Sequence, residues 1–312
     1  MKPFQTILVS AALDDRDTTT MRHAARFAQG VEAKTVYVAH VAPTFDLPAQ
    51  GGGKEPELAV PVDEEIDQKL RAIIEAQRSL FPAEVVFHCV ERQGALATEL
   101  IRLAAQKNAD LVCLGRRAAQ GHDSLSESAM RLVRKSPCSV LIVPPGVEAR
   151  YDRIVVPVDF SDHSRAALSA AFAIAQSMPG ATVTALHIYS VPLGWHKGPH
   201  SYEEFAAVMK GHAERNWNAF LATVDTLGVP WTVRFELEDD VLKAIVAVAD
   251  EIDASLLVLG SHGRTRPAGI LLGHVADTVC AGTARAVLCV KRKGEVVSLL
   301  RALLQFFEFA EE

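Results

Sequence analysis

The sequence predicts an α/β protein made of two tandem doubly wound domains, each a five-stranded parallel sheet flanked by helices. Three observations lead to this prediction. Short apolar runs alternate with stretches of helical periodicity, which is the pattern of strands connected by covering helices. The apolar runs are continuous, so both faces of each strand are expected to be buried, as in parallel sheets. The chain also repeats itself, because residues 7, 40 and 140 correspond to residues 154, 187 and 287 at a constant offset of 147.

The repeat is visible in three apolar segments. Ile7-Leu8-Val9-Ser10 returns as Ile154-Val155-Val156-Pro157, Ala39-His40-Val41 returns as Leu186-His187-Ile188, and Ser139–Val143 returns as Ala286–Val290. A duplication provides an internal control. Residues shared by both copies are expected to serve the fold, and a special residue kept in one copy is expected to serve its chemistry.

The first copy, residues 1–147, begins on a β-branched run and then alternates apolar runs with amphipathic stretches. A Gly/Pro-rich loop over Pro43–Pro61 stands outside the repeat, and Pro144-Pro145-Gly146 ends the unit and opens a linker to Tyr151. The expected strands are Thr6–Ala11, Thr35–Val41, Val85–Val90, Asp110–Gly115 and Ser139–Val143. The expected helices are Thr18–Gln29, Glu64–Ser79, Ala95–Lys107 and Ser128–Lys135.

The second copy, residues 151–293, repeats this order with an Ala-rich first helix and a fourth strand that stops on glycine. The expected strands are Arg153–Val158, Thr182–Tyr189, Thr232–Leu237, Ser255–Gly260 and Ala286–Lys291. The expected helices are Ser164–Gln176, Tyr202–Thr226, Val241–Glu251 and Gly273–Ala281. We expect the two units to pack about a pseudo-twofold axis through their terminal strands.

Residues 294–312 form a predicted amphipathic helix outside the repeat. Its apolar positions follow the i, i+3, i+4, i+7 spacing and are Val296, Leu299, Leu300, Leu303, Leu304 and Phe307. We expect this tail to pack onto its own domains or to form a dimer contact. A membrane surface is disfavoured because the polar face lacks Lys and Arg enrichment.

Composition narrows the class of protein. The 312 residues are 49% hydrophobic and 22% charged, the balance of a soluble globular protein, and the net charge of −6 disfavours a nucleic-acid groove. No apolar run reaches the roughly 18 residues that span a bilayer, and the N-terminus has no signal-peptide pattern. The five cysteines show no C-x-x-C spacing, which favours reduced thiols. A cytoplasmic location is expected.

Glycines after the fourth strand of the second copy point to an anion site. Gly260 and Gly263 lie in Gly-Ser-His-Gly-Arg, and Gly273 opens a helix. Residues without Cβ let backbone N–H groups approach an anion closely, and the positive end of a helix favours phosphate. Arg264 adds a cation at the same place. The alternative is that these glycines end a strand and permit close packing.

Asp159 follows the first strand of the second copy, so it lies at the carboxyl end of a strand next to the glycine segment. A carboxylate there accepts ribose hydroxyl hydrogen bonds or helps to hold a divalent cation on phosphates. The alternative is an N-cap for the next helix. Ser161 and Asp162 are better placed as caps, which favours a ligand role for Asp159.

These motifs make the chain similar to a tandem universal stress protein over Gln5–Val143 and Arg153–Lys291. The family pattern G-x2-G-x9-G-(S/T) reads here Gly260-x2-Gly263-x9-Gly273-His274, beside Val156-Pro157-Val158-Asp159. The resemblance implies a stress-response sensor or regulator that binds an adenine nucleotide, above all ATP, with Mg²⁺ as a candidate companion. It also implies a homodimer and an unidentified downstream protein partner. Carried over by position, the binding residues are Pro157, Asp159, Ile188, Leu259, Gly260, Gly263, Gly273, His274 and Val275, with Arg264 beside them.

His274 departs from the family pattern, where a Ser or Thr donates to phosphate. Imidazole also donates and gains charge when protonated, but it is bulkier. The alternative is that His274 points to solvent.

The first copy lacks the motif. Ser126-Glu127 stands where Gly-Ser/Thr belongs, Ala118 replaces the second glycine and Ala12 replaces the aspartate. We expect this unit to serve as a structural partner or to bind something other than ATP, with Arg116 and Arg117 as candidate anion contacts.

No motif for rapid catalysis is present. The chain lacks G-x-S-x-G and a Walker-type lysine, so at most slow ATP hydrolysis is expected. His187, His196, His200 and His212 are too loosely spaced to favour zinc. His40 and His187 occupy equivalent positions, which indicates a shared structural role. The alternative function is a scaffold or small-ligand module that has lost nucleotide binding.

Overall fold

The computed structural model describes residues 4–43, 62–117, 126–197, 201–262 and 273–291. The predicted loop over Pro43–Pro61 therefore falls almost wholly outside the described residues, and the predicted tail over 294–312 falls outside them completely.

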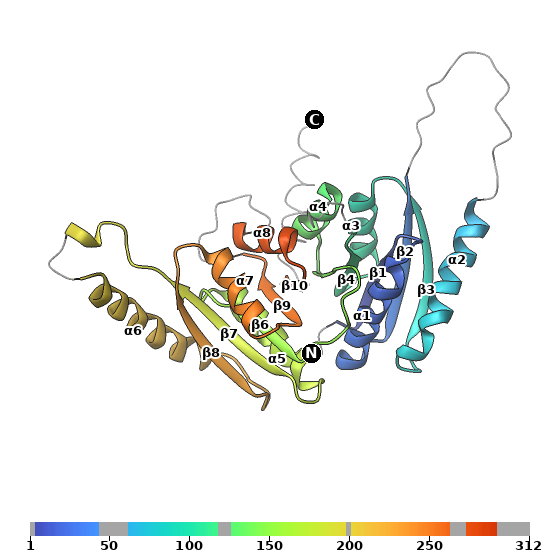
Figure 1. Cartoon of the computed structure of the whole chain (residues 1–312). Helices are drawn as coiled ribbons and strands as arrows, with labels where there is room; N and C mark the ends of the chain where they lie inside the picture. The colour runs from blue at the N-terminus through green and yellow to red at the C-terminus, as the bar shows by residue number, and fades with distance from the viewer. Residues whose placement is uncertain (1–3, 44–61, 118–125, 198–200, 263–272, 292–312) are drawn as a thin grey trace, which may run out of the picture.

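The described strands form one ten-stranded sheet in the order β3-β2-β1-β4-β5-β10-β9-β6-β7-β8 (Figure 1). The first half of the sheet contains β1 (Thr6–Ala11), β2 (Thr35–Ala42), β3 (Val86–Gln93), β4 (Leu111–Gly115) and β5 (Ser139–Val143). The second half contains β6 (Arg153–Pro157), β7 (Thr182–Tyr189), β8 (Trp231–Leu237), β9 (Leu256–Gly260) and β10 (Ala286–Val290). Neighbouring strands are parallel within each half. The predicted α/β class with two five-stranded parallel units is confirmed.

Helices cover both faces of the sheet. They are α1 (Arg16–Val31), α2 (Val62–Gln77), α3 (Leu96–Gln106), α4 (Glu127–Lys135), α5 (Asp162–Gln176), α6 (Tyr202–Leu221), α7 (Val241–Glu251) and α8 (His274–Gly282), with single turns of 3₁₀ helix at Arg78–Leu80 and Trp195–Lys197. None of the described helices is long and apolar enough to span a bilayer.

The apolar core has two layers, one on each face of the sheet. One layer joins α1, α2, α5 and α6 to the sheet through side chains such as Phe27, Leu70, Phe172 and Phe220. The other layer joins α3, α4, α7 and α8 through Leu100, Leu132, Ile245 and Val279. Each layer includes residues of both halves, so the two repeats share a continuous core.

Most predicted boundaries agree with the structure within two or three residues, but one helix is shorter than expected. The sequence pattern predicted a helix over Tyr202–Thr226, and α6 ends at Leu221. The Thr223 hydroxyl donates to the Phe220 carbonyl at 2.7 Å, and the Asp225 carboxylate accepts the Leu227 N–H at 2.9 Å. These local bonds compete with helical ones and turn the chain toward β8.

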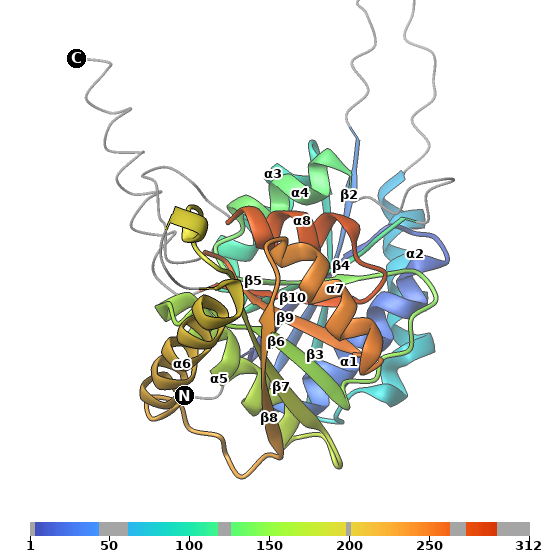
Figure 2. The ribbon, with the colours of Figure 1, turned by 60° about the vertical axis from the view of Figure 1, so that its left-hand side comes forward.

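The two halves meet where β5 and β10 pair antiparallel, as expected for terminal strands. Val140, Leu141 and Ile142 pair with Cys289, Leu288 and Val287, and all six residues are buried. Because this pair is antiparallel, the carboxyl ends of the strands point in opposite directions in the two halves. The same pairing places α4 against α8 on one face (Figure 2) and α1 against α5 on the other.

Cations of each half contact the last helix of the other half. The Arg116 guanidinium, which follows β4, donates to the Thr283 carbonyl at the end of α8. The Lys291 ammonium, which follows β10, donates to the carbonyls of Arg134 and Ser136 at the end of α4, at 2.8 and 2.9 Å. Both cations are buried, and burial lowers the pKa of Lys291. Cations at helix C-termini satisfy carbonyls that lack intrahelical partners.

A buried hydrogen bond joins α1 to the linker between the halves. His23 and Tyr151 are 0% and 1% exposed, and His23 Nδ1 lies 2.6 Å from the Tyr151 hydroxyl. His23 Nε2 lies 3.1 Å from the Val147 carbonyl, which can only accept. Nε2 therefore carries the proton, and Tyr151 donates to Nδ1.

Tyr151→Phe should lower the free energy of unfolding by about 1–3 kcal/mol, because it leaves the buried Nδ1 of His23 without its donor. Equilibrium unfolding in urea measures the change. Tyr189→Phe, at a half-buried position at the end of β7, provides the control and should have little effect. Equal stability of wild type and Tyr151→Phe would contradict this role.

The stability provided by His23 should depend on pH. Burial lowers the pKa of His23 below its ordinary value of 6.5, and the hydrogen bond to Val147 offsets part of this change. The unfolded chain therefore binds the proton more readily, so stability is lost as pH falls through about 6.5. The difference in unfolding free energy between wild type and His23→Gln should shrink when pH is lowered from about 7.5 to about 5.5. A difference that grows over this range would contradict the prediction.

Candidate functional site

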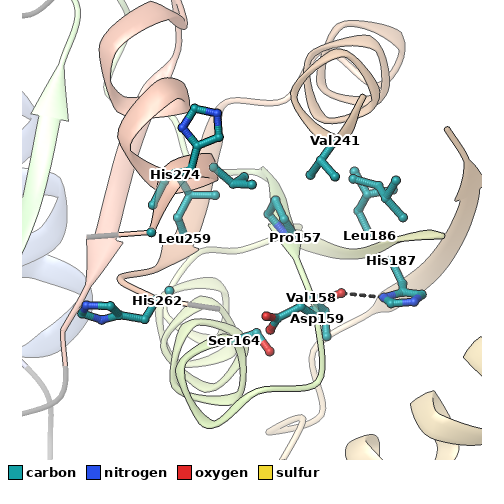
Figure 3. Close-up of a pocket in the computed structure, with 15 residues that line it drawn as sticks. Pro157, Val158, Asp159, Ser164, Leu186, His187, Val241, Leu259, His262 and His274 are labelled. Carbon is teal, nitrogen blue, oxygen red and sulfur yellow. Dashed lines mark hydrogen bonds between the residues drawn. The ribbon is translucent and has the colours of Figure 1, made fainter. Parts of the chain in front are cut away.

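A cavity of about 360 Å³ lies beyond the carboxyl ends of β6, β7 and β9 in the second half (Figure 3). In parallel α/β sheets this edge is where ligands bind. Leu186 and Val241 lie together at one side of the cavity, His274 stands on α8, and Asp159 and Ser164 lie near the start of α5. The cavity therefore combines an apolar wall with a polar one.

The loop from β6 to α5 positions Asp159. Ser161 is the N-cap of α5, and its hydroxyl accepts the Ser164 N–H at 3.2 Å. Asp159 Oδ1 accepts the Ser161 N–H at 3.1 Å, so Asp159 braces the loop and does not cap the helix. Phe160 adopts a positive φ of 66°, which turns the chain sharply between strand and helix. The prediction that Ser161 is better placed as the cap is confirmed.

His187 and His40 have the same structural role in the two halves. His187 Nδ1 lies 2.7 Å from the Val158 carbonyl, and His40 Nδ1 lies 3.0 Å from the Ala11 carbonyl. Each imidazole therefore donates from Nδ1 to a carbonyl at the carboxyl end of the first strand of its own half. The predicted shared role is confirmed.

Gly260 ends β9 where the backbone of α5 comes very close. A Cβ at this position would lie 2.7 Å from the carbonyl carbon of His163 and 2.8 Å from its oxygen. Close packing therefore requires glycine here, which was the alternative to a direct anion role. The next residue, Ser261, places its hydroxyl 3.3 Å from Nδ1 of His163 and 3.1 Å from Nδ1 of His262.

The first turn of α8 forms the far wall of the cavity. Gly273 is the N-cap residue and offers no side chain to cap the helix, while its own N–H donates to the Ser261 carbonyl at 2.8 Å. The N–H groups of the first turn have no intrahelical acceptors, and the helix dipole is positive at this end. His274 is exposed on the first turn, and Val275 is half-buried. This helix start can accept an anion from the cavity.

Eight of the ten sequence-predicted residues line this cavity. They are Pro157, Asp159, Ile188, Leu259, Gly260, Gly273, His274 and Val275. Gly263 and Arg264 lie outside the described residues. The binding role of all ten stays a prediction.

Sequence reasoning missed further lining residues, including Ser164, Val241 and His262. His262 lies between Gly260 and Gly263, so the glycine motif could have predicted it as a lining residue. Ser164 and Val241 sit at the beginnings of helices that follow strands, and no motif marks them. Within the part of the chain that the structure describes, no three His, Cys, Asp or Glu side chains gather as a metal site.

The first half has a cavity of similar size, about 370 Å³, at the matching edge of β1, β2 and β4. Ser10, Val41 and Leu114 line it at positions equivalent to Pro157, Ile188 and Leu259. The loss of the glycine motif has therefore not closed the cavity.

Comparison with known proteins agrees with this architecture. Two universal stress proteins of Methanocaldococcus jannaschii are 28% and 32% identical to this chain in sequence. Each match covers 46% of this chain, and the two matches cover 96% and 85% of the relatives' own lengths. The crystal structure of a universal stress protein from Archaeoglobus fulgidus DSM 4304 covers 93% of this chain and 97% of its own with a TM-score of 0.62 at 18% identity, which supports the fold. The model of the universal stress protein family matches residues 3–144 and again residues 150–291. Two consecutive matches over nearly the whole chain show that it belongs to the universal stress protein family, in a tandem form.

Proposed function

We propose that the second half binds an adenine nucleotide, above all ATP, in the cavity between β6, β9 and α8. The observation that carries this proposal is the start of α8, which has no side-chain cap among the described residues and faces the same cavity as Asp159. An anion in the cavity can accept hydrogen bonds from these N–H groups and interact favourably with the dipole. The wall of Pro157, Leu186 and Val241 suits a flat apolar base.

The position of Asp159 suits a carboxylate that binds the ribose or Mg²⁺. It is the carboxylate among the described lining residues, and it stands near the start of α5. Mg²⁺ in nucleotide sites is held by one or two carboxylates together with substrate phosphates and water. The donor set fits such an ion only when the phosphates supply further oxygens.

The proposal is binding with at most slow hydrolysis. The Asp159 carboxylate already accepts the Ser161 N–H, and His187 donates to Val158 from Nδ1, so both side chains are held in structural contacts.

We further propose a cytoplasmic homodimer that acts as a stress sensor or regulator through a downstream protein. The five cysteines, all among the described residues, form no disulfide, which supports a reducing compartment. The domain limits 1–147 and 151–293 are part of this proposal.

Ile188→Trp should weaken ATP binding at least about tenfold, because the larger ring fills the apolar part of the cavity. Calorimetry with ATP, ADP, AMP and cyclic AMP, with and without Mg²⁺, measures the affinities. Val41→Trp makes the equivalent change in the first half and should leave ATP affinity unchanged. The absence of binding by all four nucleotides to the wild type would favour a scaffold function instead.

Asp159→Asn should reduce ATP affinity in the presence of Mg²⁺ and should leave it equal or stronger without Mg²⁺. Asparagine keeps an oxygen for the Ser161 N–H and removes the negative charge that attracts Mg²⁺ and repels phosphate. Titrations of ATP with Mg²⁺ and with a chelator measure both affinities. Equal losses under the two conditions would contradict a role with the cation.

A further inference from the structure

The cavity of the first half differs from its counterpart mainly in charge. The second half has His163, Ser261 and His262 around the start of α5 and the end of β9, and the first half has Arg16, Arg116 and Arg117 at the equivalent positions. All three arginines line the first-half cavity. Ala12 stands where the second half has Asp159, so the carboxylate at the strand end is missing.

The three arginines are held in different ways. Arg116 donates to Thr283 of α8, so it belongs to the contact between the halves. Arg16 forms a bidentate ion pair with Asp14 through Nε and Nη2, at 2.8–2.9 and 2.6 Å. Arg117 is exposed, and among the described residues it interacts with the Asp14 carboxylate only through the longer-range attraction that helps to lower the pKa of Asp14, without a close ion pair. Arg117 is therefore the cation most available to a ligand, with Arg16 beside it.

One carboxylate also lines this cavity, and its oxygens are already engaged. Asp17 is 3% exposed and accepts the N–H groups of Ala12 at 2.8 Å and Asp14 at 3.2 Å. Burial raises the pKa of Asp17, and the backbone N–H bonds partly oppose this change because they stabilise the carboxylate. Among the described residues that line the cavity, there are three guanidinium groups and one carboxylate, that of Asp17.

The helix start in this cavity offers less to an anion than that of α8. Ser126 is the N-cap of α4, and its hydroxyl accepts the Ala129 N–H at 3.2 Å. A ligand here must depend on guanidinium groups more than on helix amides. Among the described residues, no carboxylate stands at the position of Asp159 to act as a ribose or Mg²⁺ partner of the kind proposed for the second half.

We propose that the first-half cavity binds a compact polyanion, carried on phosphate or carboxylate groups and without Mg²⁺, through Arg117 and Arg16. Planar guanidinium groups recognise both kinds of anion through paired hydrogen bonds. The site is separate from the nucleotide site because the two cavities lie at oppositely directed strand ends of the sheet. The two proposals therefore stand or fall independently.

The test uses the full chain, with pyrophosphate as the phosphate probe and malonate as the carboxylate probe. Calorimetry in the presence of a chelator should show binding of at least one probe, and Arg117→Gln should weaken it by about tenfold or more. Arg71→Gln removes an exposed arginine of α2 and should not change the affinity. The probe that binds more tightly shows whether the natural ligand carries phosphate or carboxylate groups. No binding of either probe, or equal affinity in Arg117→Gln, would overturn the proposal.

Two further measurements separate this site from the nucleotide site. Val41→Trp fills the first-half cavity without changing its charge and should abolish probe binding, and thermal unfolding verifies that the variant is folded. Saturating ATP, added in the same chelator so that no free Mg²⁺ complexes the probe, should leave probe binding by the wild type unchanged. Displacement of the probe by ATP in wild type, together with full probe binding by Val41→Trp, would assign the anion to the second half and refute this proposal.

Discussion

The antiparallel pairing of β5 with β10 determines the arrangement of the whole molecule. Three residue pairs, all buried, join two parallel half-sheets into one. The pairing brings α4 against α8 and α1 against α5, so the core layers on both faces continue across the junction. It also directs the carboxyl ends of the strands in opposite directions in the two halves, so the two cavities lie at oppositely directed strand ends.

The last helix of each half connects a cavity to the junction. The first turn of α8 lines the second-half cavity, and Arg116 binds the carbonyl of Thr283 just after the last turn of the same helix. In the same way α4 has Ser126 and Ala129 at the first-half cavity, and its last turn receives Lys291. An exposed bidentate ion pair between Arg134 and Asp277 links the two helices between these ends. Each helix therefore depends on a cation from the opposite half to satisfy its C-terminal carbonyls.

Much of the fold could be predicted from the sequence because it rests on local patterns. Continuous apolar runs marked the strands, and the offset between the copies predicted equivalent histidines before their carbonyl partners were known. The expectation that the terminal strands join the two halves was also correct. The predicted end of α6 was wrong because the helix is ended by hydrogen bonds of Thr223 and Asp225. These hydrogen bonds depend on the turn into β8.

Other features could not be predicted, since they depend on residues that are distant in sequence. His23 and Tyr151 are 128 positions apart, and Lys291 reaches carbonyls 155 and 157 positions away. The degenerate motif of the first half left a structural role and a ligand other than ATP both open, and it did not predict a cavity as large as that of the second half. Its walls are the ends of strands and helices, and these persist when glycines and an aspartate are replaced.

The close approach at Gly260 changes how glycine substitutions in such motifs should be interpreted. A larger residue there would displace the beginning of α5 before it met any phosphate, because the backbone of His163 occupies the space of a Cβ. Failure of a Gly260 variant to bind nucleotide would thus report a misplaced helix, with Asp159 and Ser161 carried along with it. In this chain a glycine of the nucleotide signature is retained for packing between elements, whatever the cavity holds.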